Sequence, residues 1–232
     1  MKLAVIGKGG TGQVVIKRAM AEGHAVALIL SSKDSGRSAT DLAEDLKKVD
    51  VVIDFSTANA VLRNVAACAV AGVPLIEGTT GWYENEQEMR KIVQMHNGAI
   101  VFGANFSIGV NLFYRIVEHA TVLFSKVEGY APFIEEQHHD KKKDAPSGTA
   151  LKLKKLMETR WSGEVPVAAT RAGFIPGTHR VGFDSNADQI LLSHEARSRE
   201  GFAAGALFAA KWIQAKHGIY EFTQVIDEIL KS

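Results

Sequence analysis

The sequence has a single cysteine among its 232 residues, which excludes an internal disulfide framework. That residue, Cys68, lies among small apolar residues in a segment with helical character. We expect a buried structural thiol there rather than a nucleophile. Because chains without disulfides are typical of the cytosol, we predict a cytoplasmic protein.

Excess charge of one sign and long apolar runs are also absent. The formal net charge is +1, and no basic stripe alternates with aromatic residues, so a nucleic-acid partner is not expected. The apolar run at the N-terminus is too short for a signal peptide, and no segment reaches membrane-spanning length, so no membrane partner is expected. The 46% hydrophobic and 23% charged content is typical of a globular protein with one large domain or two small ones.

Short apolar runs alternate with amphipathic segments through the first hundred residues. The runs predict strands at 2–6, 25–30, 51–55, 74–76 and 99–102, and the amphipathic segments predict helices at 10–21, 58–71 and 84–96. Such alternation is typical of a parallel sheet flanked by helices, which makes the fold class α/β.

The pattern changes after residue 105. A long helix is predicted at 109–124, an extended segment at 127–139, a helix after Ser147 and a Gly/Pro-rich loop through 163–177. Strands are predicted at 180–184 and 189–196, then a helix at 202–216, a strand at 219–222 and a last helix through Ile229. The middle of this part predicts an α+β unit with an antiparallel or mixed sheet and helices on one face.

A glycine-rich turn follows the first predicted strand and precedes the first helix: Gly7-Lys8-Gly9-Gly10-Thr11-Gly12. In the dinucleotide-binding pattern, Gly7 permits the tight turn, Gly9 lets a pyrophosphate approach the backbone, and Gly12 lets the helix pack on the strand. The alternative is a strand–helix turn that binds nothing. The position of this turn between strand and helix favours the dinucleotide.

Residues at the end of the second strand bear on which dinucleotide is bound. Sites for NAD usually place an acid there, whereas this chain has Ser31, Ser32 and Lys33. Hydroxyls and an ammonium suit a 2′-phosphate, so we predict NADPH as the preferred cofactor. Asp34 stands one position further on and keeps NADH as the alternative.

Two further loops follow strands at the edge where open parallel sheets bind ligands. Gly78-Thr79-Thr80-Gly81 comes after the fourth strand, and Asn105-Phe106-Ser107 after the fifth. We predict that these residues contact the cofactor near its nicotinamide.

The stretch from His138 to Ala150 gathers two histidines and three lysines just before a turn that opens a helix. Ser147 can cap that helix. Cations beside a helix N-terminus form a receptor for a carboxylate or phosphate, and the same groups can deliver a proton. The alternative is a solvated loop of mixed charge.

Taken in order, these motifs resemble the dihydrodipicolinate reductase family of lysine and diaminopimelate synthesis. Glu136–Ala150 matches the family signature E-x-H-H-x-x-K-x-D-A-P-S-G-T-A without a gap. Supporting matches are Gly78–Gly81, the Asn-Phe-Ser-x-Gly-x-Asn run at 105–111 and the segment 194–199. The resemblance covers essentially the whole chain. It departs in the first turn, where many members have one more residue, including an arginine near the cofactor phosphate.

The resemblance implies a Rossmann-like cofactor domain at 1–106 and 200–232, with an inserted substrate and oligomerisation domain at 107–199. It also implies closure of one domain over the other, a homotetramer, and a cyclic amino-dicarboxylate as substrate. The implied reaction transfers a hydride to ring carbon 4 of 4-hydroxy-tetrahydrodipicolinate, with loss of the 4-hydroxyl as water.

The resemblance also implies roles for individual residues. His138 and Lys142 match the acid–base pair, and the substrate-binding residues would be His139, Ser147, Gly148 and Thr149. Arg199 and Phe202 lie where the family's chain returns to the cofactor. Asp144 is expected to orient the turn or pair with a lysine. We expect no metal, because consecutive residues such as His138, His139 and Asp140 rarely converge on one ion.

Two rival functions fit parts of the sequence. Another nicotinamide enzyme, such as a diaminopimelate or amino-aldehyde dehydrogenase, would share the layout but oxidise an amino acid. A non-catalytic dinucleotide sensor would keep the glycine-rich turn but would need none of the residues from His138 to Thr149.

Overall fold

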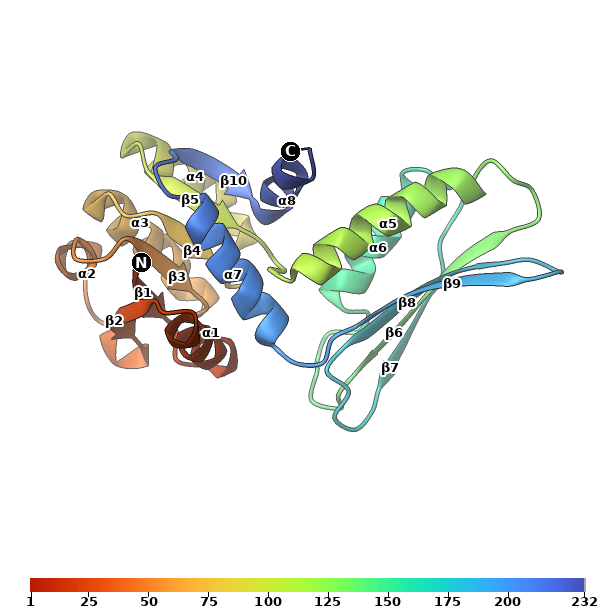
Figure 1. Ribbon diagram of the computed structural model, residues 1–232, viewed down its shortest axis with the longest axis horizontal. Helices are drawn as coiled ribbons and strands as arrows, with labels where there is room; N and C mark the ends of the chain where they lie inside the picture. Colours follow the sequence, from red (N-terminus) through yellow and green to blue (C-terminus); the bar gives the residue numbers. More distant parts are fainter. Residues whose placement is uncertain (232) are drawn as a thin grey trace. The chain divides into compact units, whose positions relative to one another are not determined.

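The computed structural model describes residues 1–231 and divides into two compact units. The first unit consists of Met1–Ile108 with the segment from Arg199 onward, and the second of Gly109–Ser198. In Figure 1 the first unit is drawn in red to yellow and again in dark blue, and the second in green to light blue.

The first unit contains a six-stranded sheet in which every neighbouring pair is parallel. Its strands are β1 (Lys2–Ile6), β2 (Ala25–Leu30), β3 (Val51–Asp54), β4 (Leu75–Glu77), β5 (Ala99–Phe102) and β10 (Gly218–Glu221), in the order β10-β5-β4-β3-β1-β2. The central strands are short and buried along their length, because helices cover both faces of the sheet. From β1 the chain adds β2 on one side and then β3 on the other, so the strand order reverses between β1 and β3. Open parallel sheets bind ligands at such a switch point.

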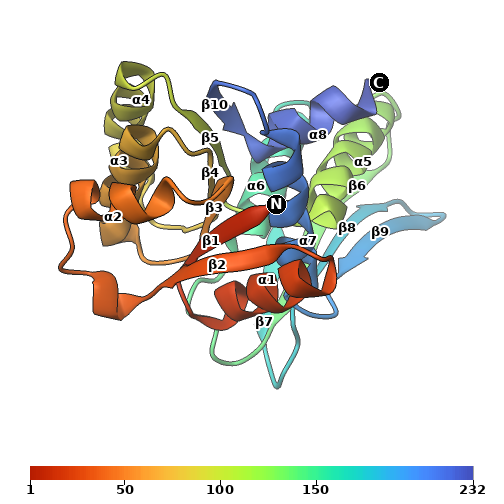
Figure 2. The same ribbon diagram turned by 60° about the vertical axis from the view of Figure 1, so that its left-hand side comes forward.

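Helices form a layer on each face of this sheet. One layer contains α1 (Gly10–Ala21), α7 (Glu200–Trp212) and α8 (Phe222–Leu230), and the other α2 (Ala39–Leu46), α3 (Val61–Ala71) and α4 (Glu86–Met95). Figure 2 shows α2, α3 and α4 on one side of the strands and α1 and α7 on the other. Single 3₁₀ turns at Ser32–Asp34, Ala58–Ala60 and Tyr83–Asn85 precede α2, α3 and α4.

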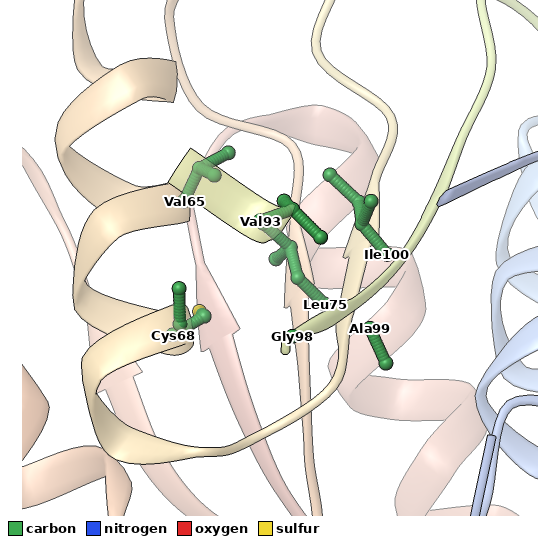
Figure 3. A pocket seen from close by; sticks show the side chains of 8 residues that line it. Val65, Cys68, Leu75, Val93, Gly98, Ala99 and Ile100 are labelled. Carbon is green, nitrogen blue, oxygen red and sulfur yellow. The ribbon is translucent and has the colours of Figure 1, made fainter. Parts of the chain in front are cut away.

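A small apolar pocket lies between α3, α4 and the strands β4 and β5 (Figure 3). Its lining includes Val65, Leu75, Val93, Ile100 and Cys68. Cys68 is buried and free, and burial raises the pKa of its thiol well above the usual value. The prediction of a structural rather than nucleophilic thiol agrees with this environment.

The second unit packs two helices on one face of a four-stranded mixed sheet (Figure 1). Its elements are α5 (Ile108–Phe124), β6 (Ala131–His138), α6 (Gly148–Glu158), β7 (Val167–Arg171), β8 (Thr178–Asp184) and β9 (Gln189–Glu195). The strand order is β7-β6-β8-β9, with β6 parallel to β7 and antiparallel to β8. Alternate residues of β6 are buried, so one face of this strand lies under α5 and α6.

The predicted fold class is confirmed, while several elements differ from the prediction. Strand β7 lies within the segment that was predicted to be a loop, 163–177. The prediction missed it because its residues are mostly exposed, and only its pairing with β6 identifies it as a strand. Helix α2 was not predicted, although Ser38 and Asp41 form a capping box at its start. Strand β6 begins at Ala131 rather than at 127, because the chain first turns at Gly129, where φ is 92°.

Among residues 1–231, no helix combines the length and the apolar character that a membrane crossing requires.

Candidate active site

The glycine-rich turn has the geometry of a dinucleotide site. Gly7 has φ 96°, and a Cβ there would lie 2.2 Å from the Phe55 carbonyl oxygen. A Cβ on Gly12 would lie 1.8 Å from the Gly7 carbonyl oxygen, whereas Gly9 borders open space. Gly9 is also the N-cap of α1 and has no side chain to bond the first-turn amides. Those amides can bind a pyrophosphate, so the turn fits the cofactor implied by the sequence.

Arg199 supplies a positive charge at this turn. A Cβ on Gly10 would lie 1.9 Å from Arg199 Nη1, so the guanidinium occupies the space beside Gly10. Arg199 is the N-cap of α7 and belongs to the same unit as the turn. The turn at 7–12 has no arginine of its own, and Arg199 places a guanidinium beside it.

The end of β2 has no carboxylate turned outward. Ser31 and Asp34 form a capping box in which Asp34 Oδ2 accepts the Ser31 N–H at 2.9 Å. Arg37 Nη1 lies 3.7 Å from the same carboxylate. Ser32 and Lys33 are exposed. Because the Asp34 carboxylate is bound to the Ser31 backbone N–H and pairs with Arg37, it is poorly placed to accept a ribose diol.

Thr79 and Phe106, both predicted to contact the cofactor, have their side chains directed inward. Thr79 Oγ1 accepts the Ser56 N–H at 3.1 Å, and the Thr79 N–H donates to Glu77 Oε1 at 2.7 Å. The Phe106 ring is buried against Phe55 and Phe222. Any contact from these two residues must therefore use backbone atoms, whereas Thr80 is exposed.

In the second unit, Glu136 and His138 lie two residues apart on the buried face of β6. His138 Nδ1 and Glu136 Oε2 form a short hydrogen bond. Arg171 Nη1 donates to Glu136 Oε2 at 3.0 Å, and Arg171 Nη2 donates to Glu136 Oε1 at 2.7 Å. The Ser147 N–H also donates to Oε1, at 3.0 Å. Glu136 is fully buried, and its carboxylate is held from three directions.

The register of the neighbouring strands brings further side chains to Glu136 and His138. In the ladders, His138 is opposite Arg171 on β7, and Glu136 is opposite His179 on β8. His179 is buried, and its ring contacts His138 edge-on with 5.2 Å between centroids. Sequence reasoning missed both Arg171 and His179, because strand pairing cannot be read from either segment alone.

Burial and charge set the protonation of the cluster. Burial raises the pKa of Glu136, but hydrogen bonds from Arg171 and His138 more than offset it, so its pKa lies below the usual value and it stays ionised. Burial lowers the pKa of His138, and Glu136 counteracts part of that effect. Burial, with the neighbouring His138, lowers the pKa of His179 to about 4, so its imidazole is neutral near pH 7.

Ser147 caps α6, as predicted, by accepting the Ala150 N–H at 3.2 Å. Its hydroxyl also bonds His179 Nε2 at 3.1 Å, and its own N–H is bound by Glu136. Ser147 is buried and its polar atoms have partners inside the unit, and its predicted contact with a substrate stays a prediction. The N-terminus of α6 instead presents Gly148 and Thr149.

Lys142 and Gly148 are bridged by a carboxylate of the chain itself. Asp144 Oδ1 accepts from Lys142 Nζ at 2.7 Å, and the Gly148 N–H donates to the same group. Burial raises the pKa of Asp144, but these bonds outweigh it and keep the pKa below the usual value. The expected pairing of Asp144 with a lysine is present. The Asp144 carboxylate therefore shows where Lys142 and the start of α6 can bind an anion.

His139 follows the strand and is half-buried, and its Nδ1 is buried without a hydrogen-bond partner in the described chain. Its carbonyl oxygen accepts the Lys142 N–H at 3.1 Å, which starts the turn that carries the lysine. Thr149 bonds the hydroxyl of Tyr114 on α5.

Glu136, His138 and His179 also resemble a metal-binding group, because their ligand-type atoms lie within 4.8 Å of one another. The Arg171 guanidinium, however, is bound to both Glu136 oxygens. That positive charge opposes a cation and occupies the ligand atoms, so we assign no metal to this cluster.

Gly177 is packed against the imidazole of His138. It has φ 145°, and an added Cβ would lie 3.0 Å from His138 Nε2. We predict that Gly177→Ala lowers the unfolding free energy by about 1–3 kcal/mol and also lowers kcat, because the methyl strains the backbone and displaces the ring. Denaturant titration and steady-state turnover measure the two effects.

Gly163→Ala is the matched control for this prediction. Gly163 also has a positive φ, 111°, but no atom lies within 4 Å of an added Cβ. It should lose stability and keep turnover. Equal turnover in the two alanine variants would show that the contact with His138 has no functional effect.

Nearly the whole chain matches known proteins. Family models described as dihydrodipicolinate reductase, N-terminus and C-terminus, match residues 1–106 and 109–226. The 4-hydroxy-tetrahydrodipicolinate reductase of Christiangramia forsetii is 32% identical, and the match covers 100% of both chains. The enzyme of that name from Archaeoglobus fulgidus is 35% identical, over 98% of this chain and 100% of its own.

A solved structure shares the fold. The dipicolinate-bound dihydrodipicolinate reductase from Paenisporosarcina sp. TG-14 superposes with a TM-score of 0.77 at 22% identity, covering 95% of this chain and 97% of its own. The family models and the relatives of more than 30% identity match the units that carry the glycine-rich turn and the Glu136–His138 cluster. This chain belongs to the dihydrodipicolinate reductase family.

Proposed function

We propose that this protein reduces 4-hydroxy-tetrahydrodipicolinate with NAD(P)H, giving tetrahydrodipicolinate and water, in lysine and diaminopimelate biosynthesis. The observation that carries the proposal is the cluster in which buried Glu136 bonds both His138 and the start of α6, with the charge of Lys142 acting on His138. Membership of the family supports the same reaction. We assign cofactor binding to the first unit and substrate binding to the second.

His138 is the proton donor in this proposal. Glu136 holds Nδ1, which leaves Nε2 as the nitrogen that exchanges a proton. The carboxylate favours the imidazolium, and a dianionic substrate nearby would favour it further. The protonated ring can then supply the proton that balances hydride addition and departure of the 4-hydroxyl as water. When bound, NAD(P)H supplies the hydride.

Lys142 and the N-terminus of α6 form the carboxylate clamp. Both donors now bind Asp144, so a substrate carboxylate has to take its place. Asp144 is more than half exposed and can turn toward solvent. The Paenisporosarcina protein binds dipicolinate, a ring of the same dicarboxylate type, which supports a small dicarboxylate as substrate.

The test follows NADPH absorbance with freshly generated cyclic substrate, and then repeats the assay with NADH. We expect turnover in the wild type and a loss of orders of magnitude in Lys142→Ala, with NADPH binding retained. Oxidation of an amino acid with the cyclic substrate untouched would favour the dehydrogenase alternative. NADPH binding without any turnover would favour a sensor.

We propose NADPH as the preferred cofactor, with Lys33 as a contact to its 2′-phosphate. Lys33 is exposed at the end of β2, where Asp34 is bound to backbone. Lys33→Ala should raise the Kd for NADPH by about tenfold and leave that for NADH unchanged, because only NADPH has the phosphate. Fluorescence titration with both cofactors measures this. An equal loss for both would contradict the assignment.

We also propose a cytoplasmic homotetramer assembled through the second unit. The family resemblance supports the assembly, and the lack of disulfides supports the location. Sedimentation of the purified chain tests the oligomeric state.

A further inference from the structure

Two fully buried carboxyl groups face each other at the carboxyl ends of β3 and β4. Asp54 and Glu77 are the last residues of these strands and are opposite each other in the parallel ladder. Both have no exposed surface. No lysine or arginine in the described chain forms an ion pair with either of them. This pair lies outside the machinery assigned above.

The outer oxygen of each carboxyl group has a donor. Asn64 Nδ2 donates to Asp54 Oδ2 at 2.7 Å, and the Thr79 N–H donates to Glu77 Oε1 at 2.7 Å. The inner oxygens, Asp54 Oδ1 and Glu77 Oε2, have no donor from elsewhere in the described chain. The ladder places the two carboxyl groups side by side, so the partner available to each inner oxygen is the other carboxyl group, and a bond between them requires a proton on one of them.

Electrostatics favours the same protonation. Burial raises the pKa of both acids, and the charge of Asp54 raises that of Glu77 well above the usual value. Ser56 and Asn64 lower the pKa of Asp54 in part. Two like charges at contact in a buried site cannot both be stable, so one proton stays in the pair at neutral pH.

The pair connects three loops at the proposed cofactor edge. Glu77 binds the Thr79 N–H in the Gly78–Gly81 loop, and Thr79 Oγ1 in turn accepts the Ser56 N–H after β3. On the other side, Arg63 donates to Asn64 Oδ1 at 3.2 and 3.0 Å, which leaves the Asn64 amide nitrogen to bind Asp54.

Arg63 extends this chain of bonds to the loop after β2. Its Nη1 donates to the carbonyl oxygens of Asp34 at 3.1 Å and Ser35 at 2.6 Å. The loop predicted to bind the 2′-phosphate is therefore linked through side chains to the loop predicted to lie near the nicotinamide.

We propose that Asp54 and Glu77 share one proton beneath the cofactor edge, and that Glu77 is a positioning residue for the Gly78–Gly81 loop. The consequence for cofactor affinity rests on the proposed function. Loss of the shared proton leaves two carboxylates in repulsion, which moves Glu77 away from Thr79. Cofactor affinity then falls as the pH rises.

Two other titratable groups near the pair stay uncharged over the pH range in which the pair would lose its proton. Cys68 on α3 has its pKa raised, first by burial and then by the two acids. Tyr83, after the Gly78–Gly81 loop, has its pKa raised to about 12, first by burial and then by Glu77. The expected change with pH therefore belongs to the acid pair.

The first test uses the protein without cofactor. Infrared spectra at neutral pH should show the C=O stretch of a buried carboxylic acid in the wild type, and Glu77→Gln and Asp54→Asn should each lose that band. Either variant can keep the contact, because its amide nitrogen replaces the shared proton. Absence of the band in the wild type, or its persistence in both variants, would overturn the shared proton.

The second test measures the Kd for NADPH between about pH 6 and 10. The wild-type Kd should rise by about tenfold toward high pH, the size expected for loss of one hydrogen bond to a charged group. Glu77→Gln should lose this tenfold rise toward high pH. Glu84→Gln, an exposed carboxylate in the same unit, serves as the control and should follow the wild type.

The outcomes separate this inference from the proposed function. A flat wild-type profile would overturn the positioning role of Glu77, even if NADPH binds well. If the wild type binds neither NADPH nor NADH, the proposed function fails, while the infrared result still decides the shared proton. Should Glu77→Gln not fold, Asp54→Asn carries both tests.

Discussion

Replacing His138 with glutamine should lower kcat by about 10²–10⁴-fold, the usual contribution of a positioned proton donor. Glutamine can still bond Glu136, so the buried carboxylate keeps a partner and the unit should fold. The Kd for NADPH should stay within about twofold of the wild type, because His138 belongs to the second unit and the glycine-rich turn to the first. Steady-state kinetics and fluorescence titration measure the two quantities.

The pH profile adds an independent readout. Burial holds the pKa of His138 below 6.5 in the free protein. A donor must be protonated, so wild-type kcat/KM should fall as the pH rises through that pKa, and His138→Gln should lose this limb. His119→Gln, an exposed histidine on α5, is the matched control and should match the wild type. A fall in kcat of less than tenfold would remove His138 from the chemistry.

Replacing Arg171 with methionine should lower the unfolding free energy by about 3–5 kcal/mol, the usual cost of leaving a buried charge without its partner. Arg171 binds both oxygens of Glu136 and also the Asp144 carbonyl oxygen. Methionine keeps much of the side-chain volume but offers no donor. Turnover should fall as well, because Glu136 positions His138 and the start of α6. Denaturant titration measures the stability.

Arg180→Met on the neighbouring strand is the matched control for Arg171. Arg180 lies 3.8 Å from Glu135, and both side chains are more than one-third exposed. A surface pair of this kind contributes at most about 1 kcal/mol. Equal losses in the two variants would show that Arg171 acts only as general packing for the sheet.

The same cluster determines a dependence of stability on acid. The pKa of Glu136 in the folded protein lies below its ordinary value of 4.5. A lowered carboxyl pKa stabilises the fold above that ordinary value, and the contribution disappears as the pH falls through the folded pKa. Arg171→Met should therefore show a weaker loss of stability in acid than the wild type.

The sequence alone determined the parallel sheet, the glycine-rich turn and the cap of α6. Each of these depends on local features: short apolar runs, glycines at set spacing, and a serine before a helical segment. The signature from Glu136 to Ala150 also predicted the acid–base pair that we propose, without any structure.

Tertiary structure alone decided which groups meet. Arg171 reaches Glu136 because β7 pairs with β6, and Glu77 meets Asp54 because β4 pairs with β3 in one register. It also turned Ser147, Thr79 and the Phe106 ring inward, although their motifs had suggested contact with ligands. The physical reason is that burial and strand register depend on residues far apart in the chain, whereas turns and caps depend on neighbours.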